Sequence, residues 1–174
     1  MTATRAYVGL GGNLGEPVVT LRAAIAALDG LPAMQLLRAS QCYRTPAWGL
    51  RDQADFVNAV ACLETTLAAR TLLDALLGLE RDFGRDRDAA SRWGPRTLDL
   101  DLLLFGDAVI DEPGLRVPHP HLHERAFALV PLFEIAPDAA LPGHGSVRAA
   151  YAAVATDGIE AITCPYDRHI VPTG

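Results

Sequence analysis

The segment at residues 98–105 limits the possible folds of this chain more than any other stretch. It reads Leu-Asp-Leu-Asp-Leu-Leu-Leu-Phe, and such alternation of apolar and acidic residues predicts a half-buried β-strand. Because side chains in a strand point to alternate faces, Asp99 and Asp101 share one face and the intervening leucines enter the core from the other. The chain must therefore build a sheet around this strand that keeps two carboxylates out of the core.

Further strand and helix patterns lie on both sides of that segment. Strands are expected at residues 5–11, 34–45, 55–65 and 98–105, with a short one near 108–110. Helices are expected at residues 17–29, 67–83, 124–135 and 147–155. The first six elements follow the order β-α-β-β-α-β of ferredoxin-like folds. We therefore expect an α+β protein with a ferredoxin-like core, additional C-terminal helices and a long loop at 85–97.

Length and composition indicate one globular domain. We expect a single domain over residues 1–174, in which the tail after about residue 145 is peripheral. Hydrophobic residues make up 50% and charged residues 21% of the chain, which excludes a disordered protein. No apolar run reaches the roughly 20 residues of a membrane span, and a signal-peptide pattern is lacking. The three cysteines are widely spaced, which argues against a disulfide framework and favours the cytoplasm.

The distribution of charge points to a small anionic ligand rather than a polymer. The formal net charge is −6, whereas nucleic-acid-binding proteins are more often basic. The chain has no lysine, and five of its fifteen arginines lie in one short window at Arg81, Arg85, Arg87, Arg92 and Arg96. Arginine forks match the geometry of phosphate oxygens. The alternative is a solvated loop in which these arginines pair with nearby aspartates.

The two aspartates of the strand suggest a metal site. Like charges this close repel each other unless a cation or an arginine lies between them. Oxygen ligands two residues apart suit magnesium that is held together with a substrate's phosphates. The alternative for Asp99 and Asp101 is a half-exposed strand face paired with arginines.

The glycine-rich segment at residues 9–15 does not match a known phosphate-binding fingerprint. The dinucleotide fingerprint requires a glycine where Leu14 stands, and no lysine follows as in a P-loop. The segment predicts a tight turn from a strand to a helix. A second possibility is that it forms part of a pocket floor.

Several motifs, taken in order along the chain, resemble the 6-hydroxymethyl-7,8-dihydropterin pyrophosphokinase family. They span residues 7 to about 137, and residues past about 145 contribute little. The motifs are Gly11-Gly12-Asn13-Leu14-Gly15, Tyr43-Arg44-Thr45-Pro46, Asp55-Phe56-Val57-Asn58-Ala59, Arg85-Asp86-Arg87, Arg92-Trp93-Gly94-Pro95-Arg96-Thr97-Leu98-Asp99-Leu100-Asp101, Val117-Pro118-His119-Pro120 and Glu124-Arg125-Ala126-Phe127.

The resemblance implies an activity and its co-substrates. The family transfers an intact pyrophosphoryl group from ATP to the hydroxymethyl group of a reduced pterin, releases AMP and serves folate biosynthesis. Two magnesium ions bridge ATP and protein. The resemblance also implies the ferredoxin-like fold. ATP and a reduced pterin are thus the expected partners, without nucleic acid or membrane, and we expect a monomer.

The same resemblance implies roles for individual residues. Asp99 and Asp101 match the metal-binding aspartates, and Arg85 and Arg96 match loop arginines that assist catalysis. The expected ATP-binding residues are Glu80 (near the ribose), Arg87, Arg92, His119 and Arg125. The expected pterin-binding residues are Thr45, Pro46, Trp48, Phe56, Asn58, Trp93 and Phe127, with the pterin between the rings of Phe56 and Phe127.

Two further classes of function remain open from the sequence. One is a ligand- or RNA-binding module on the same fold, which the acidic net charge and the aspartate pair disfavour. The other is a magnesium-dependent nucleotidyl transferase, which would release pyrophosphate instead of AMP. The chain also departs from the family pattern at Pro120, where an aromatic residue is frequent, and at Trp48, where a smaller apolar residue is usual.

Overall fold

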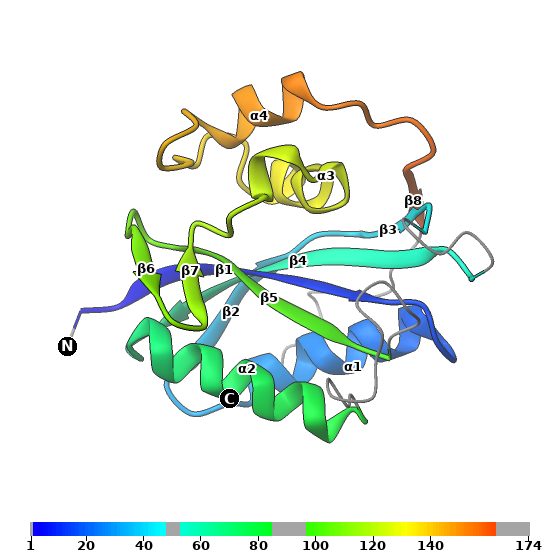
Figure 1. Ribbon diagram of the computed structural model, residues 1–174. Helices are drawn as coiled ribbons and strands as arrows, with labels where there is room; N and C mark the ends of the chain where they lie inside the picture. The colour runs from blue at the N-terminus through cyan, green and yellow to red at the C-terminus, as the bar shows by residue number, and fades with distance from the viewer. Residues whose placement is uncertain (1, 48–52, 85–96, 163–174) are drawn as a thin grey trace.

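An antiparallel sheet of six strands lies between two layers of helices (Figure 1). The structure is a computed structural model and describes residues 2–47, 53–84 and 97–162. The strands of the large sheet are β1 (Thr4–Gly12), β2 (Met34–Ala39), β3 (Cys42–Thr45), β4 (Phe56–Thr65), β5 (Asp99–Phe105) and β8 (Glu160–Ile162). Their order is β5-β1-β4-β3-β8, and β2 pairs with the other end of β4. The α+β class is confirmed.

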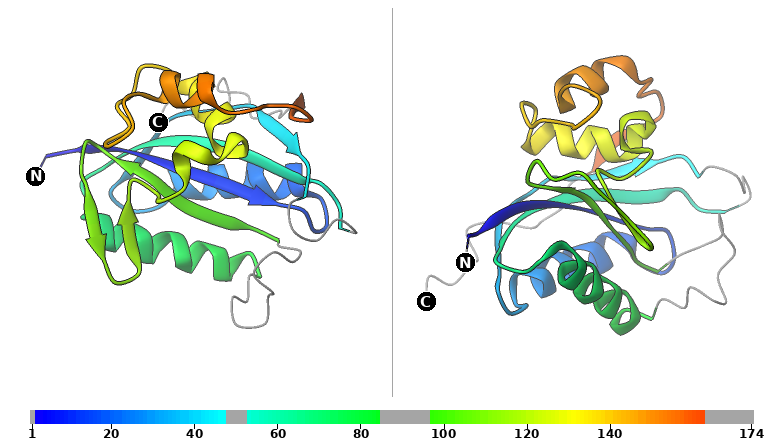
Figure 2. Two further views of the ribbon diagram at one scale, coloured as in Figure 1. Left: turned by 45° about the horizontal axis from the view of Figure 1, so that its top comes forward. Right: turned by 60° about the vertical axis from the view of Figure 1, so that its left-hand side comes forward.

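The helices cover both faces of this sheet, as the two views in Figure 2 also show. Helices α1 (Pro17–Asp29) and α2 (Ala69–Asp82) pack on one face. The short helix η1 (Leu122–Glu124), α3 (Ala126–Ile135) and α4 (Val147–Ala153) lie on the other. A small hairpin of β6 (Ile110–Glu112) and β7 (Leu115–Val117) follows β5. No helix in the described ranges is long and apolar enough to cross a membrane.

Each face of the sheet has its own core. Leu98, Leu100 and Leu102 are 0%, 1% and 5% exposed and belong to the core shared with α1 and α2. The alternation in this segment thus predicted the buried face correctly. Val60 and Leu103 belong instead to the core beneath α3 and α4.

The strand expected at residues 34–45 is interrupted, so the prediction of one continuous strand is wrong. Ser40 leaves the strand and makes two hydrogen bonds with Val60: its N–H donates to the carbonyl, and its Oγ accepts from the N–H, each at 2.9 Å. The N–H of Gln41 donates to the carboxylate of Glu134 on α3 at 3.1 Å. These contacts with distant segments replace ladder bonds and divide the strand into β2 and β3.

The glycine-rich segment is mostly strand rather than turn, which corrects the expected tight turn at residues 9–15. Gly9, Gly11 and Gly12 lie inside β1, and only Gly15 has a left-handed backbone, with φ of 65°. The turn therefore begins later than expected. The presence of glycine at positions 9 and 11 of β1 is explained by the residues that lie beside them on β4 and β5.

Candidate active site

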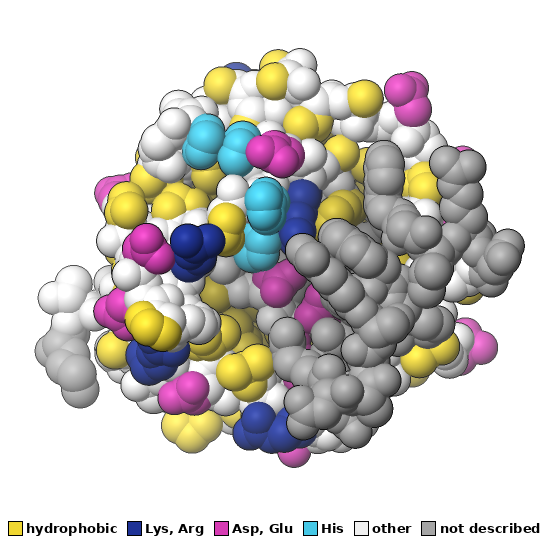
Figure 3. All heavy atoms as spheres, viewed as in Figure 1, with side chains coloured by type: hydrophobic (Ala, Val, Ile, Leu, Met, Phe, Trp, Pro, Cys, Tyr) yellow, Lys and Arg dark blue, Asp and Glu magenta, His cyan; other side chains and the backbone are white. Residues whose placement is uncertain are grey.

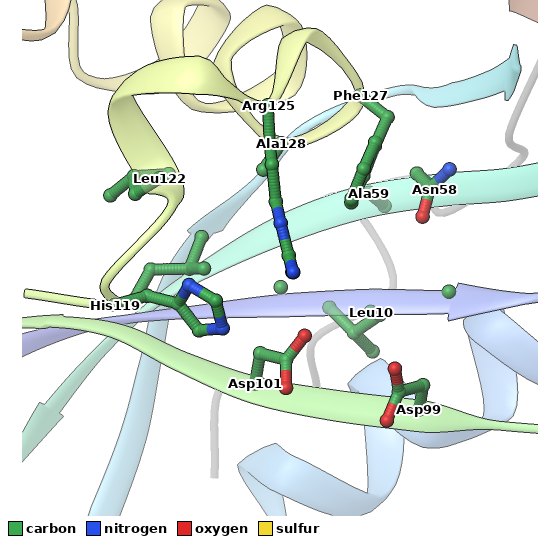
Figure 4. Close-up of a pocket in the computed structure, with 13 residues that line it drawn as sticks. Leu10, Asn58, Ala59, Asp99, Asp101, His119, Leu122, Arg125, Phe127 and Ala128 are labelled. Atoms are coloured by element: carbon green, nitrogen blue, oxygen red, sulfur yellow. The ribbon is translucent and has the colours of Figure 1, made fainter. Parts of the chain in front are cut away.

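A cleft that is partly open to solvent lies between the sheet and the start of α3 (Figure 4). Side chains from β4, β5, α3 and the segment before η1 converge on it. Its lining consists of Gly9, Leu10, Gly11, Asn58, Ala59, Asp99, Asp101, Leu103, His119, Leu122, Arg125, Phe127 and Ala128. Six of the expected site residues are thus brought together from segments far apart in the sequence.

The floor of the cleft is set by the pairing of three neighbouring strands. Gly11 lies beside Asp99 on one side and beside Asn58 on the other. Two residues along the same strand, Gly9 lies beside Asp101. Since alternate residues share a face, both glycines and both aspartates face the cleft. The two glycines carry no side chain, and the space above them is taken by the amide oxygen of Asn58 over Gly11 and by the side chain of Leu103 over Gly9.

Asp99 and Asp101 form the acidic side of this floor. Figure 4 shows both carboxylates directed into the cleft, and both groups interact with other parts of the protein. Within residues 2–47, 53–84 and 97–162, no three His, Cys, Asp or Glu side chains are grouped as metal ligands. Magnesium is usually bound by one or two carboxylates together with water and a substrate's phosphates. The pair therefore fits a magnesium ion that arrives with a phosphorylated ligand.

His119 lies above β5 and is held there by its backbone. Its N–H donates to the carbonyl of Leu103 at 3.0 Å. Burial lowers the pKa of His119 to about 4, and the charges of Arg125 and His121 act in the same direction, whereas Asp99 opposes them. The imidazole is therefore neutral near pH 7 and can both donate and accept hydrogen bonds.

Arg125 extends from the start of α3 into the cleft between His119 and Phe127 (Figure 4). Its guanidinium carbon lies 5.6 Å from the centroid of the Phe127 ring, a cation–π distance. In Figure 3, histidine and arginine side chains gather beside acidic ones on this face of the molecule. The cleft thus offers a cationic side chain opposite two carboxylates, as a phosphate–metal complex requires.

Phe127 and Asn58 form the other half of the cleft. Phe127 points from α3 toward Ala59, next to Asn58 (Figure 4). The Asn58 amide donates to Oγ1 of Thr45 at 2.8 Å. Phe56 is two residues before Asn58 on β4, so it shares the same face of the sheet. An aromatic ring beside an oriented amide suits a flat, polar heterocycle.

Four expected site residues lie outside the lining of the cleft. Phe56 is at the first position of β4, and Pro46 is exposed. Thr45 is 2% exposed and contacts Asn58. Glu80 is 1% exposed on α2, which covers the opposite face of the sheet, and its carboxylate accepts a hydrogen bond from Leu100. Trp48, Arg85, Arg87, Arg92, Trp93 and Arg96 lie outside the described residues.

The two-residue spacing of Gly9 and Gly11 indicates that they belong to a strand at the floor of the cleft. The prediction of a tight turn did not use this spacing. Gly9 and Gly11 are spaced two apart, as are Asp99 and Asp101, and each glycine lies beside one aspartate. The possibility that the segment forms a pocket floor agrees with this placement. What the sequence could not supply was the register that brings the two pairs together.

The antiparallel sheet and the side chains that line the cleft fit the class of proteins that bind phosphorylated ligands. Comparisons with known proteins narrow this class. The model of the family described as 7,8-dihydro-6-hydroxymethylpterin-pyrophosphokinase (HPPK) matches residues 7–137. The chain belongs to this family.

Curated relatives bear the corresponding name, 2-amino-4-hydroxy-6-hydroxymethyldihydropteridine pyrophosphokinase. The protein of Pseudomonas aeruginosa is 48% identical over 158 residues, which cover 91% of this chain and 96% of that protein. The protein of Methylorubrum extorquens is 42% identical over 159 residues, or 91% of this chain and 99% of that protein. These relatives are matched over nearly their whole length.

Solved structures confirm the fold. The crystal structure of wild-type HPPK-DHPS from Plasmodium falciparum superposes with a TM-score of 0.67 at 13% identity. The match covers 87% of this chain but only 41% of that chain. This chain thus corresponds to less than half of the longer protein.

Proposed function

We propose that this chain transfers pyrophosphate from ATP to the hydroxymethyl group of 6-hydroxymethyl-7,8-dihydropterin in folate biosynthesis. The observation that carries the proposal is a cleft in which a charged half adjoins an aromatic and amide half. Membership of the HPPK family makes the reaction an ATP-dependent pyrophosphoryl transfer. The hydroxyl oxygen of the pterin bonds to the β-phosphorus of ATP. The bond from that phosphorus to the α–β bridging oxygen breaks, AMP leaves with this oxygen, and the hydroxyl proton is released.

The charged half is suited to the triphosphate. Arg125 can place its guanidinium against phosphate oxygens, and neutral His119 can donate a hydrogen bond to them without adding charge. Asp99 and Asp101 would hold magnesium on the opposite side, and we propose two ions per site. Magnesium bound there supplies charge neutralisation of the transferred group. These four side chains position the reacting groups, which is the main requirement of phosphoryl transfer.

The other half is suited to the pterin. The ring of Phe127 can stack on the heterocycle, and the amide of Asn58 can hydrogen-bond its polar edge. We propose that Phe56, on the same face of β4, covers the second side of the ring. Thr45 then acts through Asn58, because its own side chain is 2% exposed.

The topology of the core and the oligomeric state are part of the same proposal. We assign the core to the ferredoxin-like class, which is supported by β5 and β4 flanking β1 in antiparallel pairing. The second strand of that class would be represented by β2 and β3 together. We also propose that the protein acts as a monomer.

The identity of the released nucleotide tests the function. The protein is mixed with ATP, magnesium and 6-hydroxymethyl-7,8-dihydropterin, and the nucleotides are separated. AMP that forms only when the pterin is present supports the proposal. ADP would indicate an ordinary kinase, and free pyrophosphate would indicate a nucleotidyl transferase. Either result would contradict the proposal.

A further inference from the structure

Glu80 is a buried carboxylate on the face of the sheet opposite the cleft. Its side chain is on α2, which packs against β5 (Figure 1). It is 1% exposed, and Oε1 accepts a hydrogen bond from the N–H of Leu100 at 2.8 Å. Leu100 is the residue between Asp99 and Asp101, so the hydrogen bond is made to the stretch of backbone that carries both carboxylates of the cleft.

The position of β5 explains why its backbone needs such a partner. In the described sheet β5 is an end strand, paired with β1 on one side only. In antiparallel pairing, successive residues direct their N–H groups alternately toward the neighbouring strand and away from it. The N–H of Leu100 donates to Glu80 on α2, so we assign it to the outward set. An outward N–H at a sheet edge requires a partner from elsewhere.

Packing against the edge of β5 does not by itself require a buried carboxylate. Removing a carboxylate from water is energetically costly, and an apolar side chain would fill the space without that cost. What the carboxylate adds is a short, strong and directional hydrogen bond to one defined amide. It fixes the outer edge of β5 at the point where the cleft needs two side chains at a defined spacing.

We propose that Glu80 is a positioning residue that holds the backbone between Asp99 and Asp101 from beneath the sheet. It thereby sets the geometry with which the two carboxylates meet a metal–triphosphate complex. The contact with the ribose that the family resemblance implied for Glu80 stays a prediction. The inference rests on the proposed function, because that proposal gives the two aspartates their role in binding the metal.

Two substitutions separate the hydrogen bond from the shape of the side chain. Glu80→Gln keeps an oxygen acceptor in nearly the same volume, whereas Glu80→Met keeps the volume and removes the acceptor. Leu76→Val serves as the matched control, since Leu76 is fully buried one turn earlier on α2. It loosens the same core without touching β5's amide. If Glu80→Met does not fold, Glu80→Asp shortens the side chain and withdraws the acceptor instead.

The first readout is exchange of the Leu100 amide with deuterium, followed by NMR. The second is binding of Mn²⁺ with α,β-methylene-ATP, followed by the electron paramagnetic resonance of free Mn²⁺. We expect Glu80→Met to speed exchange at Leu100 and to weaken Mn²⁺ binding about tenfold or more, the effect typical of losing a group that orients a metal ligand. Glu80→Gln should stay near the wild type, and Leu76→Val should lower stability without changing Mn²⁺ affinity.

The outcomes distinguish this inference from the proposed function. Asp99→Asn is measured alongside as the reference for metal binding. If Asp99→Asn leaves Mn²⁺ affinity unchanged, the proposed function of the pair is wrong. If Asp99→Asn weakens Mn²⁺ binding and folded Glu80→Met does not, the positioning role alone is overturned. An equal loss in Leu76→Val and Glu80→Met would also overturn it, because general destabilisation would then account for both.

Discussion

The side-chain amide of Asn58 donates a hydrogen bond to the hydroxyl of Thr45, with 2.8 Å between Nδ2 and Oγ1. Its oxygen lies over Gly11, where an added Cβ would stand 2.6 Å from Oδ1. The amide is thus held between a hydroxyl on β3 and bare backbone on β1. A polar group oriented in this way distinguishes ligands by their hydrogen-bonding edges.

Replacing Gly11 with alanine should displace the Asn58 amide. A Cβ at 2.6 Å from Oδ1 is closer than van der Waals contact allows. We expect the affinity for the pterin to fall about tenfold or more, equivalent to about 1.4 kcal/mol, with little change in ATP affinity. Fluorescence titration with each substrate measures both. The control is Gly78→Ala on α2, where the nearest atom is the mobile end of Arg81 at 3.6 Å.

Replacing Thr45 with valine should remove the hydrogen bond that orients Asn58 and keep the shape. A hydrogen bond contributes about 0.5–1.5 kcal/mol, so we expect pterin affinity to fall roughly two- to tenfold. Thr45→Ser retains the hydroxyl and should bind nearly as well as the wild type. Equal binding by the valine and serine variants would show that Thr45 does not orient the amide.

Asp99→Asn and Asp101→Asn should each abolish most of the pyrophosphoryl transfer. Each substitution removes one charge from the pair that faces the cleft and weakens metal binding accordingly. We expect turnover to fall at least about a hundredfold, a cost of at least about 2.7 kcal/mol in transition-state stabilisation. Asp107→Asn is the control, because Asp107 is exposed just beyond β5 and should retain wild-type turnover.

His119 should make stability depend on pH below neutrality. Its pKa is lowered to about 4, chiefly by burial, so between pH 6.5 and about 4 the unfolded chain binds a proton there and the folded chain does not. The free energy of unfolding therefore falls as pH falls through this window and is unaffected above it. Urea unfolding at pH 5 and pH 7 should show a smaller decrease in His119→Gln than in the wild type. Equal decreases would contradict the lowered pKa.

The positive charge of Arg125 should lower the pKa of His119. Its positive charge is the second cause of the lowering, so Arg125→Leu should bring the His119 pKa closer to its ordinary value. NMR titration of the His119 ring protons measures the pKa in both proteins. A further decrease in the variant would mean that the charge of Arg125 does not act on this ring.

The elements that depend on local patterns could be predicted from the sequence. The helix expected at residues 17–29 has those bounds in the structure, because Pro17 begins it and its apolar spacing is regular. The alternation at residues 98–105 likewise identified the face that carries Asp99 and Asp101. In both cases the information lies in neighbouring residues.

The elements that depend on distant contacts could not be predicted. The break after β2 rests on hydrogen bonds between Ser40 and Val60 and on the bond that the Gln41 N–H donates to Glu134. Glu80 lies on an amphipathic helix, where nothing in the sequence distinguishes a buried carboxylate from a solvated one. Its partner Leu100 is 20 residues further along the chain. Such contacts appear only once the sheet register and the packing of α2 are known.

The most direct test of the central claim follows the β-phosphate of ATP. The protein is incubated with magnesium, the reduced pterin and ATP labelled on either the β- or the γ-phosphate, and the pterin product is isolated. Pyrophosphoryl transfer places both labels in the pterin product and leaves unlabelled AMP. If only the γ label reaches the pterin and the β label stays in ADP, the chain is an ordinary kinase and the proposed pyrophosphoryl transfer is wrong.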